Sequence, residues 1–358
     1  MIAQRLLPIP DSVALLTSEP ADMIWNEVLM KKVISPTRSL ALAAVLLVVA
    51  ACSPLRAEVE VKQSGNDVIS VAIDGQPFTD FYIGSKYPKP FLAPLRTASG
   101  LIVTRKYPME NVDGETRDHQ HHRGLWIGYG EINGVNFWEN EFKYVSGQPK
   151  NYDPGKIGKV VLRKVNEAKS SSKSGKVDAT FEWLGSNDSD FMEEHRVMTF
   201  SGTTDTRVID VDPTFTAKQA VHFADTKEGF FAIRLADSMT GKNGGLMTNS
   251  EGAQTEKNVW GKRANWVDYD GTVDGQKVGI VIFDHPKNFN HPTRWHSRDY
   301  GLFAANPFGL KDFDPKATEE GGHSMASGDT LRFRYRVIIH PGDMPKKNIE
   351  KLYAEYAK

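Results

Sequence analysis

The chain has 358 residues, of which 40% are hydrophobic and 25% are charged, and its formal net charge at pH 7 is −1. This is an ordinary globular composition with enough length for a sizeable core. No basic excess points to a nucleic-acid partner, and no acidic run points to a disordered tail.

The N-terminal region has the pattern of an export signal. A basic segment runs from Met30 to Arg38, an apolar stretch covers 40–49, and Ala50 and Ala51 precede Cys52. A charged start, a short apolar run and small residues before a cleavage point are typical of a secretory signal. The run is well short of the roughly 20 apolar residues of a transmembrane span. We therefore predict a lipoprotein signal peptide over 30–51, and interpret 1–29 as an upstream extension from a misassigned start.

Cys52 is the only cysteine of the chain, so no intramolecular disulfide can form. Its place directly after Val-Ala-Ala resembles a bacterial lipobox. The resemblance implies cleavage before Cys52 and a diacylglyceryl thioether on its sulfur, which tethers the domain to a membrane surface. Because Ser53 is not the aspartate of an inner-membrane retention signal, an outer-membrane tether is favoured.

From Val59 onward, short runs rich in β-branched and aromatic residues alternate with Gly, Asp and Pro turns. We predict strands at 59–61, 68–73, 78–83, 101–104, 159–165, 176–183, 191–200, 206–216, 230–236, 266–269, 277–283, 300–305 and 330–339. Residues 348–356 have the apolar spacing of a helix. So many strands without βαβ alternation predict an all-β sandwich or barrel, with 52–358 as one domain.

Three histidines fall within four residues, at His119, His121 and His122, and Arg123 follows them. If the stretch is extended, His119, His121 and Arg123 share one face and His122 takes the other. Imidazole titrates near neutrality, which suits proton transfer. Structural histidines are the alternative, but three of them clustered with an arginine favour a functional site.

Metal binding is a separate hypothesis for the same stretch. His-x-His on a strand is a half-site for zinc, copper or iron. A cupin site also needs a glutamate about four residues on, which this stretch lacks, and Arg123 would repel a dication. We therefore expect no metal and no other cofactor, and keep a metal-dependent oxidoreductase as an alternative.

A second polar and aromatic stretch runs from Phe283 to Tyr300. Aromatic rings here and at Trp126 can stack on the apolar face of a sugar, and arginines can bind hydroxyls or a carboxylate. The predicted ligand-binding residues are Arg123, Trp126, Arg263, Trp295, His296, Arg298, Asp299, Tyr300 and Asn306. An ordered polar loop is the competing interpretation.

Glu251 is a candidate general acid or base, since a carboxylate paired with imidazole covers both proton roles. A solvated turn carboxylate is an equally good interpretation of Glu251 alone. The other histidines are isolated in sequence and are interpreted as structural, namely His195, His222, His323 and His340.

Several motifs together resemble the bacterial PmoA-like proteins, which carry the label methane oxygenase. The matching runs are Asp118 to Trp126, Gly128 to Gly130, Asn133 to Trp138, Trp266 to Tyr269, Phe283 to Pro286 and Trp295 to Pro307. The resemblance implies carbohydrate metabolism and a galactose-mutarotase-like supersandwich of two packed antiparallel sheets with a short C-terminal helix. In mutarotases, two histidines and a carboxylate act on the ring oxygen and anomeric hydroxyl of a sugar.

The sequence thus predicts an exported, lipid-anchored protein that acts on a saccharide by histidine-based acid–base catalysis, with hydrolysis, elimination or isomerisation as the reaction. His119, His121, His122 and Glu251 are the predicted catalytic residues. A carbohydrate-binding lipoprotein without chemistry is the alternative. The expected partners are the saccharide and, through the lipid only, a membrane.

Overall fold

The computed structural model describes residues 58–145, 147–150 and 152–358. The predicted upstream extension, the signal peptide and Cys52 therefore lie outside the described residues. Across the ranges that are described, no helix has both the length and the apolar character needed to cross a membrane.

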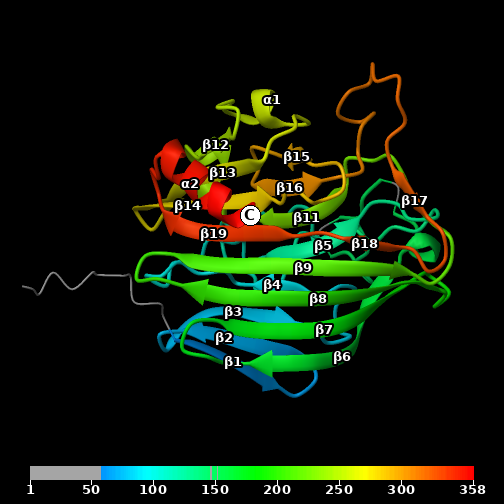
Figure 1. The fold of residues 1–358 in the computed structure, drawn as a ribbon, viewed down its shortest axis with the longest axis horizontal. Helices are drawn as coiled ribbons and strands as arrows, with labels where there is room; N and C mark the ends of the chain where they lie inside the picture. Colours follow the sequence, from blue (N-terminus) through cyan, green and yellow to red (C-terminus); the bar gives the residue numbers. More distant parts are fainter. Residues whose placement is uncertain (1–57, 146, 151) are drawn as a thin grey trace, which may run out of the picture. The chain divides into compact units, whose positions relative to one another are not determined.

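Two large antiparallel sheets make up the fold (Figure 1). The first sheet contains, in spatial order, β1 (Val59–Ser64), β2 (Val68–Ile73), β3 (Gln76–Tyr82), β4 (Phe91–Ala93), β5 (Leu125–Tyr129), β11 (Gly229–Arg234), β16 (Leu302–Asn306) and β15 (Arg294–Ser297). The second contains β12 (Leu246–Asn249), β13 (Trp266–Val273), β14 (Gln276–Asp284), β19 (Tyr335–Pro341), β9 (Arg207–Ala217), β8 (Asp190–Gly202), β7 (Gly175–Leu184) and β6 (Lys159–Lys169), and β18 (Thr330–Arg332) also pairs with β9.

The remaining elements are short. β10 (Val221–Phe223) pairs with β17 (His323–Met325). The helices are η1 (Pro154–Lys156), η2 (Asp237–Met239), η3 (Gly241–Asn243), α1 (Glu256–Val259) and α2 (Lys346–Tyr356). Figure 1 shows α2 lying over β14 and β19, where Ile349 packs on Trp266, Phe283 and Ile338. This contact stabilises α2, because a short helix gains most of its stability from packing its apolar face against the protein.

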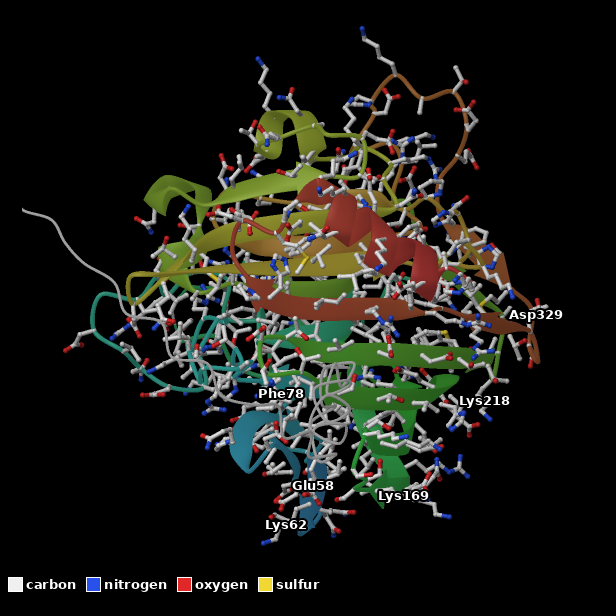
Figure 2. The ribbon with its side chains drawn as sticks, turned by 60° about the vertical axis from the view of Figure 1, so that its left-hand side comes forward. Glu58, Lys62, Phe78, Lys169, Lys218 and Asp329 are labelled. Atoms are coloured by element: carbon white, nitrogen blue, oxygen red, sulfur yellow. The ribbon has the colours of Figure 1, made fainter. Side chains whose placement is uncertain are left out.

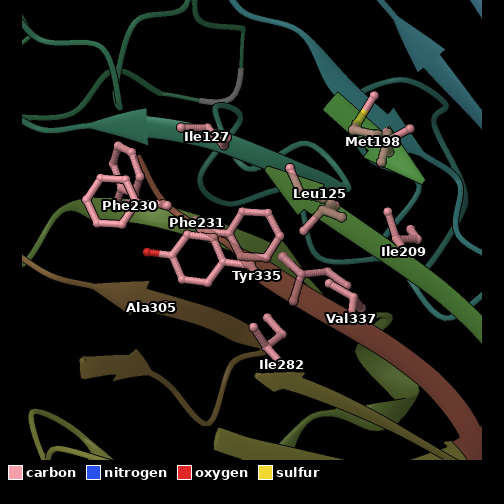
Figure 3. Close-up of a cluster of buried hydrophobic side chains, with 14 of the residues drawn as sticks. Leu125, Ile127, Met198, Ile209, Phe230, Phe231, Ile282, Ala305, Tyr335 and Val337 are labelled. Carbon is pink, nitrogen blue, oxygen red and sulfur yellow. The ribbon is translucent and has the colours of Figure 1, made fainter. Parts of the chain in front are cut away.

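The core lies between the two sheets. Along β7 and β9, side chains alternate between buried and partly exposed, as a period of two requires when one face packs inward. Figure 3 shows side chains of both sheets meeting in the core, and the ring of Phe231 stacks on that of Tyr335 at 4.5 Å. Burying one large apolar side chain stabilises the fold by about 1.5–3 kcal/mol.

The two sheets also meet along one edge. Val59 and Ser171 exchange backbone hydrogen bonds of 3.0 and 3.2 Å, which join β1 to the turn between β6 and β7. Figure 2 shows Glu58, Lys62 and Lys169 at this end of the molecule. Charged side chains at a sheet edge oppose pairing with another chain.

The predicted all-β fold of two packed antiparallel sheets with a short C-terminal helix is confirmed. Two predicted strands differ in detail. Residues 101–104 form only isolated bridges, from Ile102 to Arg96 and from Thr104 to Leu235. Residues 330–339 form two strands, because β18 and β19 pair with different parts of β9.

Candidate functional site

The outer face of the first sheet, which points away from the core, carries a row of side chains in register across five strands. Phe91 pairs with Trp126, Trp126 with Ala232, Ala232 with Ala304, and Ala304 with His296. At about 4.8 Å per strand, the Cα atoms of Trp126 and His296 lie about 14 Å apart. Two alanines form the floor between them. We call this face, with the loops that cover it, the outer site.

The histidine stretch covers the outer site as a turn and not as a strand, so the faces considered for an extended 119–123 do not apply. His119 has a φ of 40°, and the N–H of His122 donates to the carbonyl of His119 at 2.9 Å. The turn places the rings of His121 and His122 together, with centroids 4.4 Å apart. All three imidazoles therefore lie in one cluster, where an extended chain would have turned His122 away.

Asp118 fixes this turn in place. Its Oδ1 accepts hydrogen bonds from the guanidiniums of Arg105 and Arg234, the latter at 2.7 Å, and its Oδ2 lies 3.0 Å from Nδ1 of His119. Burial alone would raise the pKa of Asp118, but the bond from His119 and the two guanidinium charges lower it far below its usual range. The carboxylate is therefore ionised and holds the turn by charge-assisted bonds.

His122 is buried and presents an unpaired N–H group. Its ring stacks between those of Trp126, at 5.1 Å, and His119, at 4.8 Å. Nδ1 lies 3.2 Å from Nη1 of Arg234, which can only donate, so Nδ1 accepts and the proton is on Nε2. Burial, together with the charges of His121 and Arg234, lowers the pKa of His122 well below its usual value. The ring is neutral at pH 7, and its Nε2–H has no partner among the described residues.

His296 presents the opposite group. Its Nδ1 lies 2.9 Å from the carbonyl of Lys227, which can only accept, so Nδ1 carries the proton and Nε2 carries a lone pair. Burial, followed by the charges of Arg298 and Lys227, lowers the pKa of His296 to about 3. Its Nε2 also has no partner among the described residues. The outer site therefore offers one free proton donor and one free acceptor.

Buried nitrogen atoms without partners gather in the outer site. Each would cost about 1–3 kcal/mol if it stayed unpaired. Such groups normally find a partner in the protein, in ordered water or in a ligand. Within the described ranges the set comprises Nε2 of His122, Nε1 of Trp126, Nε1 of Trp138, Nε of Arg234 and Nε2 of His296.

Tyr300 forms the rim and brings the second predicted stretch to the first. Its ring lies parallel to that of His119 with centroids 4.9 Å apart, and the guanidinium of Arg234 lies 4.8 Å from the ring centre. Arg298 lies 5.5 Å from the same ring and pairs with Glu256 at 2.9 Å. Tyr300 thus brings the two stretches together, and Arg298 lies beside it.

Asp299 is exposed, and its hydrogen bonds are made by its backbone groups. Its N–H donates to Glu256 at 2.6 Å and its carbonyl accepts from Gly241 at 2.9 Å. These bonds fix the loop before β16. The carboxylate of Asp299 has no role in the buried part of the outer site.

Trp295 and Asn306 are not ligand-binding residues. Neighbours on β15 point to opposite faces, so Trp295 enters the core where His296 faces outward. Trp295 is 0% exposed, and its Nε1 donates to the carbonyl of Ala264. The side-chain oxygen of Asn306 accepts from the N–H groups of Phe308 and Gly309, which closes a turn.

Arg263, Arg123 and Glu251 also depart from their predicted roles. Arg263 donates to the carbonyls of Asn290 and Pro292, both at 2.7 Å, and so braces a loop. Arg123 is buried in a two-pronged ion pair with Glu141, at 2.9 and 2.5 Å. Glu251 is an exposed turn residue whose carboxylate accepts from Ser250. The bonds of Arg263 and Arg123 indicate structural roles, and Glu251 agrees with the solvated turn carboxylate that the sequence also allowed.

The sequence interpretation missed Arg234, Trp138 and Glu139. Arg234 could have been found as a lone charge in the apolar run that begins at Phe230, because a charged residue is rarely buried without a partner. Glu139 follows Trp138 and lines a cavity of about 560 Å³ together with Glu228. Burial, and then the charge of Glu228, raises the pKa of the Glu139 carboxyl.

The three clustered imidazoles are not arranged as a metal centre. Within the described part of the chain, one set of three His, Cys, Asp or Glu side chains has ligand atoms that all lie within 4.8 Å of one another. This set is Asp268, Asp270 and His340, on the second sheet. The outer site instead combines neutral imidazoles, indole N–H groups and an arginine. These groups suit an uncharged polar ligand or an anionic one.

The fold and the outer site define an all-β sandwich with a polar and aromatic site on one sheet. The chain belongs to the family described as "Family of unknown function (DUF6807)", whose model matches residues 68–354. No curated protein matches the chain.

Solved structures that are similar to the chain include two that are described as enzymes. One is a GH36 alpha-galactosidase from Geobacillus stearothermophilus, with 7% identity and a TM-score of 0.38 over 79% of this chain and 41% of that one. Another is a putative aldose 1-epimerase from Escherichia coli K12, with 11% identity and a TM-score of 0.31 over 79% of this chain and 99% of that one.

The chain spans about two fifths of the length of the first structures that it matches, for instance 42% of the galactosidase domain of alpha-galactosidase-sucrose kinase, at 9% identity and a TM-score of 0.36. With TM-scores below 0.5 these likenesses are weak.

Proposed function

We propose that the protein binds a saccharide at the outer site and acts on it by acid–base catalysis. The observation that carries the proposal is the set of unpaired nitrogen atoms on an aromatic surface. A sugar offers hydroxyl groups that both donate and accept, and apolar C–H faces that pack on aromatic rings. It can therefore satisfy the free groups of His122 and His296 in one binding mode.

The proposed chemistry needs one acid and one base on opposite sides of the reacting centre. Nε2–H of His122 donates toward an oxygen of the substrate, which supports the leaving group or an opening ring. Nε2 of His296 accepts a proton from a hydroxyl or from carbon. Hydrolysis, elimination and isomerisation all need this pair. Arg234, beside His122 and Tyr300, stabilises negative charge that develops on oxygen.

His119 and His121 have supporting positions in this mechanism. His119 lies at the rim with a side chain that is 38% exposed, so it can contact a ligand as it enters. His121 is buried, and its Nδ1 lies 3.3 Å from the hydroxyl of Tyr144. Its ring packs against His122 and so orients the proposed acid. Glu139, which lines the adjacent cavity, is a candidate for the carboxylate partner that was predicted at Glu251.

The test compares the wild-type protein with His122→Gln and His296→Gln on a panel of oligosaccharides. Products are read by mass spectrometry and anomer exchange by NMR. Each variant should lower turnover about 10²- to 10⁴-fold, the range that general acid–base groups contribute. His195→Gln is the matched control, because His195 pairs with Asp178 on the surface of the second sheet. Unchanged turnover in both site variants would reject the catalytic assignment.

A binding protein without chemistry is the second candidate. It is favoured by the lowered pKa of His122, since a neutral imidazole is a weak acid. Retention of a glycan on the wild-type protein, its loss in His122→Gln, and no product from any member of the panel would support this candidate over the enzyme.

We also propose, from the sequence, that the protein is exported and lipid-anchored at Cys52, with an outer-membrane tether, and that it is PmoA-like. The signal pattern over 30–51 supports the anchor. Mass spectrometry of the protein from membranes should find a diacylated N-terminal Cys52. A mature N-terminus elsewhere would contradict the anchor and leave the proposal for the outer site unaffected.

A further inference from the structure

We propose a second site, for a divalent transition-metal ion such as Zn²⁺, formed by Asp268, Asp270 and His340 on the second sheet. The side chains come from β13 and β19, and β14 runs between them. Their ligand atoms all lie within 4.8 Å of one another. The sequence interpretation took His340 for an isolated structural histidine, and the sheet register shows why it is not isolated.

The register places a glycine at the centre of this group. Asp270 pairs with Gly279 and Gly279 pairs with His340, so the three residues form one row across three strands. Asp268 lies two residues before Asp270 and therefore points to the same face. A Cβ on Gly279 would lie 2.1 Å from Cε1 of His340 and 2.5 Å from Oδ1 of Asp270. Glycine lets the imidazole reach over β14 to both carboxylates.

Hydrogen bonding orients the imidazole as a metal ligand. Nδ1 of His340 lies 2.7 Å from the carbonyl of Pro341, so it donates there and Nε2 is left with a lone pair in the neutral ring. Metal-bound histidines commonly donate the other N–H in this way. Nε2 lies 3.1 Å from Oδ1 of Asp268, and two lone pairs face each other unless a cation lies between them.

A proton on Nε2 satisfies only part of this arrangement. It pairs His340 with Asp268 but leaves Oδ1 of Asp270, which is buried, without a partner among the described residues. A divalent ion serves the two carboxylates and the imidazole together, and this mixed O and N set is one that Zn²⁺ accepts. With bonds of about 2.0–2.2 Å, tetrahedral ligand atoms lie about 3.3–3.6 Å apart. Metal binding would therefore lengthen the 3.1 Å between Nε2 of His340 and Oδ1 of Asp268 slightly and shorten the longer separations, which all lie within 4.8 Å.

The group lies away from bulk solvent. Asp268 and His340 are 2% and 1% exposed, and Asp270 is partly buried. His340 also lines a cavity of about 150 Å³, together with residues at the start of β14.

The test is metal binding by the full chain, which is separate from turnover at the outer site. Protein stripped with a chelator is titrated with Zn²⁺ and Mn²⁺ by calorimetry, and metal content after dialysis is measured by elemental analysis. We expect one Zn²⁺ per chain and a rise in melting temperature. Asp270→Asn and His340→Gln should each weaken binding by more than about 100-fold, beyond the cost of losing an outer-shell partner.

His195→Gln is the matched control, since it removes an imidazole from a surface histidine–aspartate pair on the same sheet and should leave binding unchanged. If the two site variants fail to fold, the wild-type protein loaded with Co²⁺ decides, because its visible spectrum should show a four-coordinate site with one nitrogen ligand. Absence of stoichiometric binding by the wild-type protein, or binding that survives in folded Asp270→Asn and His340→Gln, would overturn the proposal.

Discussion

The imidazole of His119 lies parallel to the phenol ring of Tyr300, with ring centroids 4.9 Å apart and planes 8° from parallel. This contact joins two segments far apart in the sequence. Because Arg234 also lies 4.8 Å from the centre of the Tyr300 ring, the phenol contacts both an imidazole and a guanidinium. The rim of the outer site depends on this stack.

Replacing Tyr300 separates the roles of its ring and its hydroxyl. Tyr300→Phe keeps both ring contacts and should leave the unfolding free energy within about 0.5 kcal/mol of wild type. Tyr300→Ala removes the stack and the cation–π contact and should lower it by about 1–3 kcal/mol. It should also weaken glycan binding about tenfold. Urea unfolding and glycan titration measure both effects, and equal behaviour of the two variants would contradict the role of the ring.

Acid should destabilise the protein through its buried histidines. The pKa of His296 is lowered from 6.5 to about 3, and those of His121 and His122 are lowered well below 6.5. Between these values the unfolded state binds more protons than the folded state, so stability rises with pH. The stability that comes from keeping these histidines neutral is fully present above about pH 6.5, and it is lost as the pH falls toward 3.

The measurement is the unfolding free energy from urea titrations between pH 7.5 and 4. His296→Gln should show a shallower fall than wild type, because one of the depressed groups is gone. His195→Gln, at the surface, should follow the wild-type curve. A His296→Gln curve parallel to that of wild type would show that His296 is not buried in its neutral form.

Because Arg123 and Glu141 form a buried ion pair, replacing one of them should lower the unfolding free energy far more than replacing both. Both side chains are nearly fully buried, so Glu141→Gln leaves a guanidinium charge without its partner. We expect a loss of about 3–5 kcal/mol in unfolding free energy. The double variant Arg123→Met with Glu141→Leu should lose far less. Equal losses would mean that packing, and not charge, dominates at this position.

The stack of Phe231 on Tyr335 should be a major contact between the sheets, since the two rings lie 4.5 Å apart and come from different sheets. Phe231→Ala should lower the unfolding free energy by about 3–5 kcal/mol. Phe231→Leu fills most of the volume and should cost less. Thermal and urea unfolding give both values, and a loss below about 1 kcal/mol for Phe231→Ala would show that the core relaxes around the cavity.

The sequence by itself determined the all-β fold. Alternation of apolar and polar residues, as in β9, reports which side chains point inward, because successive residues of a strand face opposite sides. It also predicts a functional site at the His119–His122 stretch, since imidazole clusters are rarely needed for packing. The stack of Tyr300 on His119 brings the second polar stretch to the first.

Only the tertiary structure decided which neighbours face the site. Trp295 and His296 are adjacent, and the pairing of β15 with β16 sends one to the core and the other to the outer site. The turn at His119 depends on Asp118 being held by two arginines, one of them on a distant strand. Likewise, Asp268 and His340 meet only because Gly279 lies between them in the register. Each is a relation between strands, which local patterns in a single sequence do not encode.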